Sequence, residues 1–436
     1  MSRKRGSLSR SKLAVLLSFA TIANLSGCGQ KELETGPVRQ YESEERIAVN
    51  LFCDEAISSG IWSEPITSKD GTRIQIIDEA ASYYNEEGTE AYRSFLRNRL
   101  QDTSEVDLYI ITAEDVIDYH KLNLWCDLSK LKGVGYLTED ALLQSTYRGE
   151  VFSIPLTYTG FGFYWNLDIL KRYQLEVPQN LEEFLTVCQV LKENGIVPYI
   201  GNMGYALTVP AMAAGFADLY AASDHDERIA ALSTGETPVS KYMEKGFELI
   251  ELMRDKGYID VDFSLNSFPK NTDRAAFLAG EGAFYCDSLG ADLSGAVFPV
   301  IMTGIPVLEK GQVSIVGANF RVAVNPNSTK WGYAIEVLEY LSAPEQSSQF
   351  AKEHGEMSTI AGSDTSYLGE QYQDFAALVQ SGGQIPNQDF NLTFNTWSNI
   401  RDICREILQG QTASQAARHY DEIQQKEIAE SGEPER

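Results

Sequence analysis

The sequence predicts an α/β protein whose sheet is rich in parallel strands. Segments with the character of buried strands alternate with segments of helical periodicity, the pattern typical of strand–helix–strand units. Hydrophobic residues make up 43% and aromatic residues 11% of the 436 residues, which is enough for a packed core and excludes global disorder. This length allows two or three domain-sized units.

Residues 1–27 predict a signal peptide of the lipoprotein type. Five basic residues precede an apolar run over 13–23, which is too short to span a bilayer comfortably. Small residues then lead to Cys28 in the sequence LSGC, which resembles a lipobox, where the cysteine is diacylated and becomes the first mature residue. Two acyl chains suffice for stable anchoring. We therefore expect a lipid anchor on the outer face of the cell membrane, followed by a flexible tether over 28–45; an uncleaved anchor is the alternative.

The first half of the folded chain is expected to begin near Arg46 with a strand over 47–52. Residues 53–72 contain serine, glycine and proline and favour loops. Apolar residues at helical spacing predict a helix over 90–101. A buried strand is expected over 107–111, and the aromatic stretch 151–166 is rich in β-signals.

The second half continues the alternation. Asn180 as N-cap, with acidic residues in the first turn and Gly195 beyond the end, predicts a helix over 180–192. An extended segment follows at 198–201. Further helices are expected over 240–256, 331–341 and 395–408, and one starting near Thr412.

The charge and the cysteines limit the range of functions. The chain carries a net charge of −26, and the mature part is still more acidic because the signal peptide holds basic residues only. Nucleic acid and anionic lipid surfaces should repel such a protein. Beyond Cys28, five scattered cysteines without C-x-x-C spacing predict buried thiols, neither a disulfide framework nor a zinc site.

Several motifs occur in a fixed order along the chain. They are residues 147–155 (YRGEVFSIP), 162–170 (GFYWNLDIL), 177–184 (VPQNLEEF), 195–198 (GIVP), 277–284 (FLAGEGAF), and the helical stretch from Trp397 through Gly410 to Ala417. In this order they resemble the signature of extracellular solute-binding proteins of the maltose-binding type. Those proteins are the ligand-capturing subunits of ABC importers, mostly for sugars and oligosaccharides.

This resemblance implies a type II, two-lobed periplasmic-binding-protein-like fold with a central hinge and an interlobe ligand cleft. It places the hinge crossings near 158–160 and 317–320. The N-terminal lobe would comprise 46–159 plus 317–361, and the C-terminal lobe 160–316 plus 362–430. The family usually has a long helix directly after strand one, whereas this chain has the loop-like segment 53–72. The wall of the N-terminal pocket is therefore not carried over.

Ligand-binding residues follow from the same resemblance, since sugar sites need aromatic faces and planar polar groups. Trp397 falls where the family places a tryptophan that stacks on sugar, and Tyr205 where it often has a ligand-facing aromatic. Tyr158 lies at the first crossing and Asn319 at the second. Asp287 precedes SLG, where many members have glycine and tryptophan, so either it bonds the ligand or that subsite is lost. A purely structural role is the alternative for each.

In the N-terminal lobe the candidates rest on position alone. Phe52 and Asp54 end strand one, Glu114 lies just past the strand over 107–111, and Trp62 could stack from the irregular loop. Trp165 stands where the family has tyrosine in the core, so we expect it to pack.

Enzyme signatures are missing from the sequence. It contains no G-x-S-x-G, H-E-x-x-H, P-loop or G-x-G-x-x-G pattern, and its four histidines are isolated. We therefore predict a non-enzymatic protein with no cofactor or metal. The family resemblance implies a monomeric binding protein with a carbohydrate ligand and ABC permease subunits as partners, and the lipobox implies a lipid anchor in the membrane. An extracellular sensor or adhesion protein is the first alternative, and a glycosidase is the second.

Overall fold

The computed structural model describes residues 46–53, 59–80, 89–102, 105–267 and 272–431. Cys28, the predicted signal peptide and the tether lie outside these residues, as does Asp54. From Glu45 onward the chain forms one compact unit. Among the described residues no helix has the length and apolar character needed to cross a membrane.

The first strands of the chain are parallel, as the sequence predicts, but the described sheet as a whole is mixed, because most of its other pairings are antiparallel. Strand β1 (Arg46–Cys53) pairs in parallel with β3 (Arg73–Ala80) along its whole length, and with β4 (Leu108–Ile110) on its other side. Strand β2 (Ile66–Thr67) is antiparallel to β3 and lies at the edge. The predicted strands over 47–52 and 107–111 are thereby confirmed.

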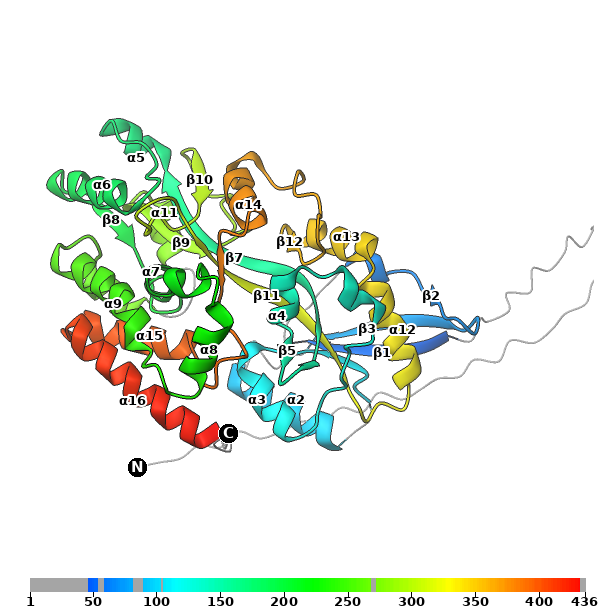
Figure 1. Cartoon of the computed structure of the whole chain (residues 1–436). Helices are drawn as coiled ribbons and strands as arrows, with labels where there is room; N and C mark the ends of the chain where they lie inside the picture. The colour runs from blue at the N-terminus through cyan, green and yellow to red at the C-terminus, as the bar shows by residue number, and fades with distance from the viewer. Residues whose placement is uncertain (1–45, 54–58, 81–88, 103–104, 268–271, 432–436) are drawn as a thin grey trace, which may run out of the picture. The chain divides into compact units, whose positions relative to one another are not determined.

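Two long antiparallel strands continue from this group into the rest of the sheet (Figure 1). They are β7 (Ile154–Asn166) and β11 (Ser314–Val324), and Gly317 pairs with Thr159 while Asn319 pairs with Thr157. The two hinge crossings expected from the sequence are therefore neighbours in one ladder. The exact lobe boundaries stay a prediction.

The C-terminal strands extend the sheet beyond β7. Strands β9 (Gly282–Ser288) and β8 (Val197–Ile200) are parallel to each other, and the described order is β2-β3-β1-β4-β11-β7-β9-β8. Short strands join its flanks: β10 (Val300–Thr303) and β12 (Met357–Ser358) pair with β7, and β13 (Gln384–Pro386) pairs with β11. A separate hairpin consists of β5 (Thr146–Tyr147) and β6 (Glu150–Val151).

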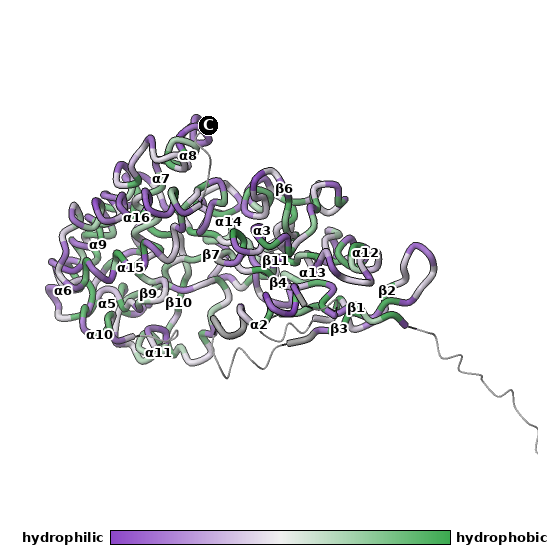
Figure 2. Tube along the Cα trace, turned by 90° about the horizontal axis from the view of Figure 1, so that it is seen from below, coloured by the Kyte–Doolittle hydropathy of each residue, from purple (hydrophilic) through white to green (hydrophobic). Residues whose placement is uncertain are grey.

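Helices surround the two groups of strands (Figure 1). The N-terminal group has α2 (Thr89–Asp102), α3 (Val116–Lys121), α4 (Glu139–Leu143), α12 (Trp331–Leu341) and α13 (Pro344–His354). The C-terminal group has α5 (Leu167–Arg172), α6 (Leu181–Glu193), α7 (Thr208–Tyr220), α8 (His225–Ser233), α9 (Ser240–Asp255), α10 (Val261–Asn266), α11 (Thr272–Leu278), α14 (Gln373–Gln380), α15 (Trp397–Leu408) and α16 (Ala413–Ser431). In Figure 2 many outer helices alternate between hydrophilic and hydrophobic positions, as amphipathic helices do.

The core of the C-terminal group is aromatic. Trp165, Phe163, Tyr199 and Phe284 are fully buried, and the rings of Trp165 and Phe284 lie 4.4 Å apart. The indole N–H of Trp165 donates to the hydroxyl of Thr303 at 2.9 Å, so its expected packing role is confirmed. Of the described cysteines, none forms a disulfide and all but Cys126 are buried.

Most of the predicted helices are present at the expected positions. Asn180 caps α6 by accepting a 3.0 Å hydrogen bond from the backbone N–H of Glu183. Helix α12 has the predicted limits, and Pro344 both follows its end and opens α13, since a proline ring suits the first turn of a helix. Helix α7 was not predicted, because its mostly buried residues leave no amphipathic pattern to read.

Candidate functional site

Three aromatic rings from three separate elements form a continuous row. The ring centroid of Phe161, on β7, lies 5.3 Å from that of Trp397, the first residue of α15. It lies 5.4 Å from the ring centroid of Tyr205, in the turn between β8 and α7. Trp397 and Phe161 are partly exposed, whereas Tyr205 is 6% exposed. This aromatic row (Tyr205, Phe161, Trp397) offers flat apolar faces of the kind that bind the face of a ring-shaped ligand.

A charged cluster, buried except for part of Arg274, closes the Tyr205 end of the row. The hydroxyl of Tyr205 donates to Oδ1 of Asp287 at 2.9 Å, and the guanidinium of Arg274 on α11 holds Oδ2 at 2.7 Å. Asp287 is only 2% exposed, and a buried carboxylate needs such pairing to remain charged. Burial and the neighbouring charge of Asp287 raise the pKa of Tyr205, so the phenol remains a neutral donor. We call Tyr205, Asp287 and Arg274 the polar end.

A second acidic residue supports the turn that carries Tyr205. Asn202 accepts hydrogen bonds from the backbone N–H groups of Gly204 at 2.6 Å and Tyr205 at 3.1 Å. Its own side-chain N–H donates to Oδ2 of Asp273 at 2.6 Å. Burial, and then the negative charge of Asp287, raise the pKa of Asp273 to about 6. Asn202 thereby joins the turn that carries Tyr205 to α11.

Polar side chains on the two hinge strands gather around one carboxylate. Glu356, just before β12, accepts hydrogen bonds from the hydroxyls of Thr157 and Thr159 and from the amide of Asn319 at 3.1 Å. Thr159, Asn319 and Glu356 are partly exposed. The structure thus places the candidate Asn319 in a network that joins both crossings. Glu356 was missed, because nothing in the sequence marks the residue before β12.

Tyr158 faces away from this network. Successive residues of a strand point to opposite faces of the sheet, and Tyr158 lies between Thr157 and Thr159. Its ring is 4% exposed, and its hydroxyl bonds the hydroxyl of Thr138. Burial and the nearby charge of Asp140 raise its pKa. The structure therefore gives Tyr158 a packing position, the alternative that the sequence left open.

Phe52 and Trp62, the N-terminal candidates whose side chains the structure describes, do not join the aromatic row. Phe52 is 3% exposed, and its ring centroid lies 5.9 Å from that of Phe95. Trp62 is 6% exposed and lies in the core, where its ring centroid is 5.5 Å from that of Phe350 of α13. The backbone of Glu114 lies in the short 3-10 helix Ala113–Asp115, but its side chain is outside the described part of the chain. Of the seven candidates whose side chains the structure describes, Trp397, Tyr205 and Asp287 are therefore brought together, with Phe161 between the two aromatic rings.

A separate cavity of about 760 Å³ opens between α6, α7 and α9. It contains no residue of the aromatic row or of the polar end. Among the described residues no group of three His, Cys, Asp or Glu side chains could hold a metal ion.

Comparisons with known proteins agree with this arrangement. A family model described as bacterial extracellular solute-binding protein matches residues 85–379. No curated protein matches the chain. A family 1 extracellular solute-binding protein from Bifidobacterium longum subsp. infantis has a similar structure, with a TM-score of 0.70, 15% identity, and coverage of 87% of this chain and 99% of that one.

Two sugar complexes are similar as well. RafE from Streptococcus pneumoniae, solved with raffinose, has a TM-score of 0.65 and 14% identity, covering 88% of this chain and 100% of that one. A sugar transporter protein from Bacillus licheniformis, solved with stachyose, has a TM-score of 0.60 and 18% identity, covering 87% and 100%. The fold is thus that of two-lobed solute-binding proteins.

Proposed function

Because the chain belongs to the bacterial extracellular solute-binding protein family, we propose that it captures a carbohydrate and delivers it to an ABC importer. The ligand would be a mono- or oligosaccharide. The proposal rests on one observation above all: the aromatic row ends in a buried phenol and a buried carboxylate, which is paired with a partly exposed guanidinium.

The chemistry of this arrangement matches that of a sugar. The two faces of a pyranose ring are largely C–H surface, which suits the rings of Trp397 and Phe161. Its hydroxyls donate and accept hydrogen bonds, and the polar end offers both kinds of group. The similar proteins RafE and the Bacillus licheniformis protein were solved with raffinose and stachyose, which supports the same ligand class here.

Capture would proceed by closure about the hinge strands. A ligand that contacts both lobes only in the closed form favours that form by its additional binding energy. The Glu356 network spans β7 and β11, so it lies where the backbone has to adjust. The closed form would then dock on permease subunits and release the sugar chemically unchanged.

The other parts of the proposal concern location and state. We propose that Cys28 carries the lipid anchor, that residues 28–45 form the tether and that the protein acts as a monomer. A sensor or adhesion role uses the same binding step. Neighbouring genes for two permeases would favour import, whereas a neighbouring sensor kinase would favour signalling.

The proposal is tested by a thermal-shift screen of the mature chain carrying Cys28→Ser. Raffinose, stachyose and maltose are the probes, with spermidine and a tripeptide as the other classes. A ligand that binds only the native state raises the melting temperature, so at least one sugar should do so and be recovered intact. A shift with the tripeptide or spermidine but with no sugar would refute the carbohydrate assignment, and cleavage of the sugar would favour a glycosidase.

A further inference from the structure

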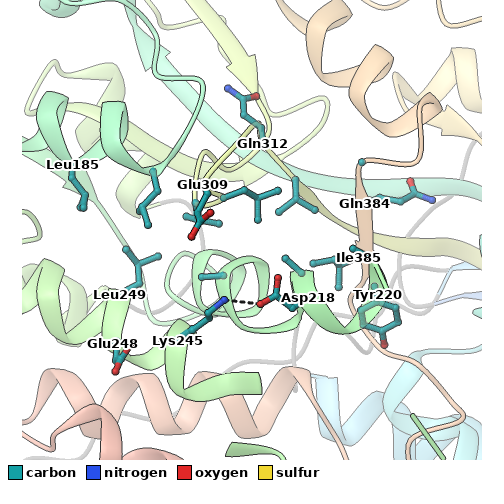
Figure 3. A pocket seen from close by; sticks show the side chains of 18 of the residues that line it. Leu185, Asp218, Tyr220, Lys245, Glu248, Leu249, Glu309, Gln312, Gln384 and Ile385 are labelled. Carbon is teal, nitrogen blue, oxygen red and sulfur yellow. Dashed lines mark hydrogen bonds and ion pairs between the residues drawn. The ribbon is translucent and has the colours of Figure 1, made fainter. Parts of the chain in front are cut away.

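The cavity between α6, α7 and α9 is a second space for a ligand (Figure 3). Its volume of about 760 Å³ falls within the range of small-molecule sites, roughly 300–1,000 Å³. The loop 307–313 and the segment 382–385 complete its walls. Segments that are distant in the sequence therefore enclose it together.

Small residues on one face of α7 leave this space open. Ala214, Ala217 and Ala221 lie three and four residues apart and therefore on the same side of the helix, and all three line the cavity. Aliphatic side chains face them from the other walls, namely Leu181, Leu185, Leu249, Leu252, Val307 and Val313. The interior of the cavity is thus suited to a hydrocarbon.

The charged residues at this cavity are mainly acidic. Lys245 of α9 pairs with Asp218 of α7 at 2.6 Å, and both side chains are about two-thirds exposed. Glu309 extends toward the cavity from the loop on the opposite side (Figure 3). The hydrogen bond that Lys245 donates to Asp218 raises the pKa of Lys245, with smaller contributions from the charges of Glu309 and Glu248. One cation thus stands among three carboxylates.

A polar annex adjoins the apolar space. It has a volume of about 210 Å³ and shares Asp218, Lys245 and Glu248 with the larger cavity, while Lys241 and Glu244 line only the annex. Over both spaces the charged lining residues are four acids and two lysines. An apolar chamber beside an acidic one matches a ligand with a hydrocarbon body and a positively charged head.

We propose that this cavity is a second binding site, specific for a cationic amphiphile. It is independent of the sugar site, because the two share no residue. The hydrocarbon body occupies the chamber beside Ala217, and the cationic head lies near Asp218 and Glu248.

Decylammonium is the probe that tests the site. It is titrated calorimetrically into the mature chain, with decanoate and butylammonium as matched ligands that lack the positive head or the long body. We expect decylammonium to bind more tightly than either one. Equal binding of decanoate, or no binding of decylammonium, would overturn the proposal.

Variants locate the binding. Ala217→Phe fills the chamber and should weaken decylammonium binding about tenfold or more, since it displaces several methylenes. Ala230→Phe, on the exposed side of α8, is the matched control and should leave binding unchanged. If Ala217→Phe does not fold, Leu252→Trp fills the same space from α9. Unchanged binding in a folded filling variant would overturn the site.

A charge variant tests the head group. Asp218→Asn combined with Glu248→Gln removes two carboxylates and should weaken decylammonium by at most about fivefold, because these groups are exposed, while strengthening decanoate. Binding of any sugar identified in the screen should stay the same in all these variants. No change in the relative affinities of the two decyl probes would refute the cationic assignment.

Discussion

The phenol of Tyr205 donates a 2.9 Å hydrogen bond to the carboxylate of Asp287, which joins the turn after β8 to the end of β9. The same carboxylate oxygen accepts the backbone N–H of Ser288 at 2.8 Å, and the other oxygen is paired with Arg274. An aromatic ring that could contact a sugar is thereby held in place by a buried charge. The bond therefore contributes to the stability of the fold and to the orientation of the site.

Tyr205→Phe should lower the free energy of unfolding by about 2 kcal/mol, the usual contribution of a hydrogen bond to a charged group. The proposed sugar affinity should fall too, because the ring would no longer be fixed against Asp287. Urea unfolding and calorimetric titration measure the two effects. Tyr173→Phe is the control, since its hydroxyl has no hydrogen bond among the described residues, and equal losses in both variants would contradict the prediction.

Trp397→Ala should weaken the binding of any sugar found in the screen by about threefold to tenfold, the usual range for one aromatic contact. Trp397 is partly exposed and packs on Phe161 at 5.3 Å, so a ligand can reach its free face. Trp331→Ala removes an indole that is 47% exposed on α12 and should leave the affinity unchanged. If both variants bind sugar as the native protein does, the aromatic row is not the site.

Most of the elements of the fold could be predicted from the pattern of strands and helices in the sequence. Strand β1, strand β7 and helix α6 lie where alternation and capping placed them, because their patterns are strongly periodic. The positions of the two hinge crossings could not be derived from local pattern and came from the family resemblance, whereas the pairing of Thr159 with Gly317 was shown by the structure. Strand β3 was not predicted, because it follows a long irregular segment.

The site could be predicted only in part. Trp397, Tyr205 and Asp287 follow from motif positions, but Phe161 was missed. Alternation along β7 could have found it, since Phe161 lies two residues from the buried Phe163 and so on the same face. Arg274 and Glu356 act through contacts between distant segments, which no local signal reveals. Trp62 is in the core because its ring packs against Phe350 of α13, a contact that composition does not give.

The native protein should lose stability as the pH rises from about 4 to about 6, through Asp273. Burial and the charge of Asp287 raise the pKa of Asp273 to about 6 from the ordinary 3.8. Between these two pKa values the folded protein holds a proton that the unfolded chain has released. The contribution of Asp273 to stability is therefore fully present below the pKa of the unfolded chain and is lost as the pH rises to the pKa of the folded protein. The loss is at most about 3 kcal/mol.

Asp273→Asn isolates this effect. The variant keeps a side-chain oxygen that can accept from Asn202 but cannot ionise beside Asp287 and Arg274. Urea unfolding at about pH 4.5 and about pH 6.5 should show a smaller decrease for the variant than for the native protein. Asp140, whose pKa burial also raises to about 6, contributes equally to both proteins and cancels. The same decrease in both would show that Asp273 does not titrate in this range.

Gly162→Ala should destabilise the protein by about 1–3 kcal/mol or more, because an added Cβ would overpack the strand. The new atom would lie 2.2 Å from the carbonyl oxygen of Thr303, and β10 could yield only by losing its ladder with β7. Gly135→Ala is the control: an added Cβ there meets no atom within 4 Å, so its effect should be within about 0.5 kcal/mol. Thermal unfolding compares the two variants. Since Gly162 lies opposite Asp287 in the sheet, only Gly162→Ala should also weaken sugar binding, and equal melting temperatures would contradict the close approach of β10.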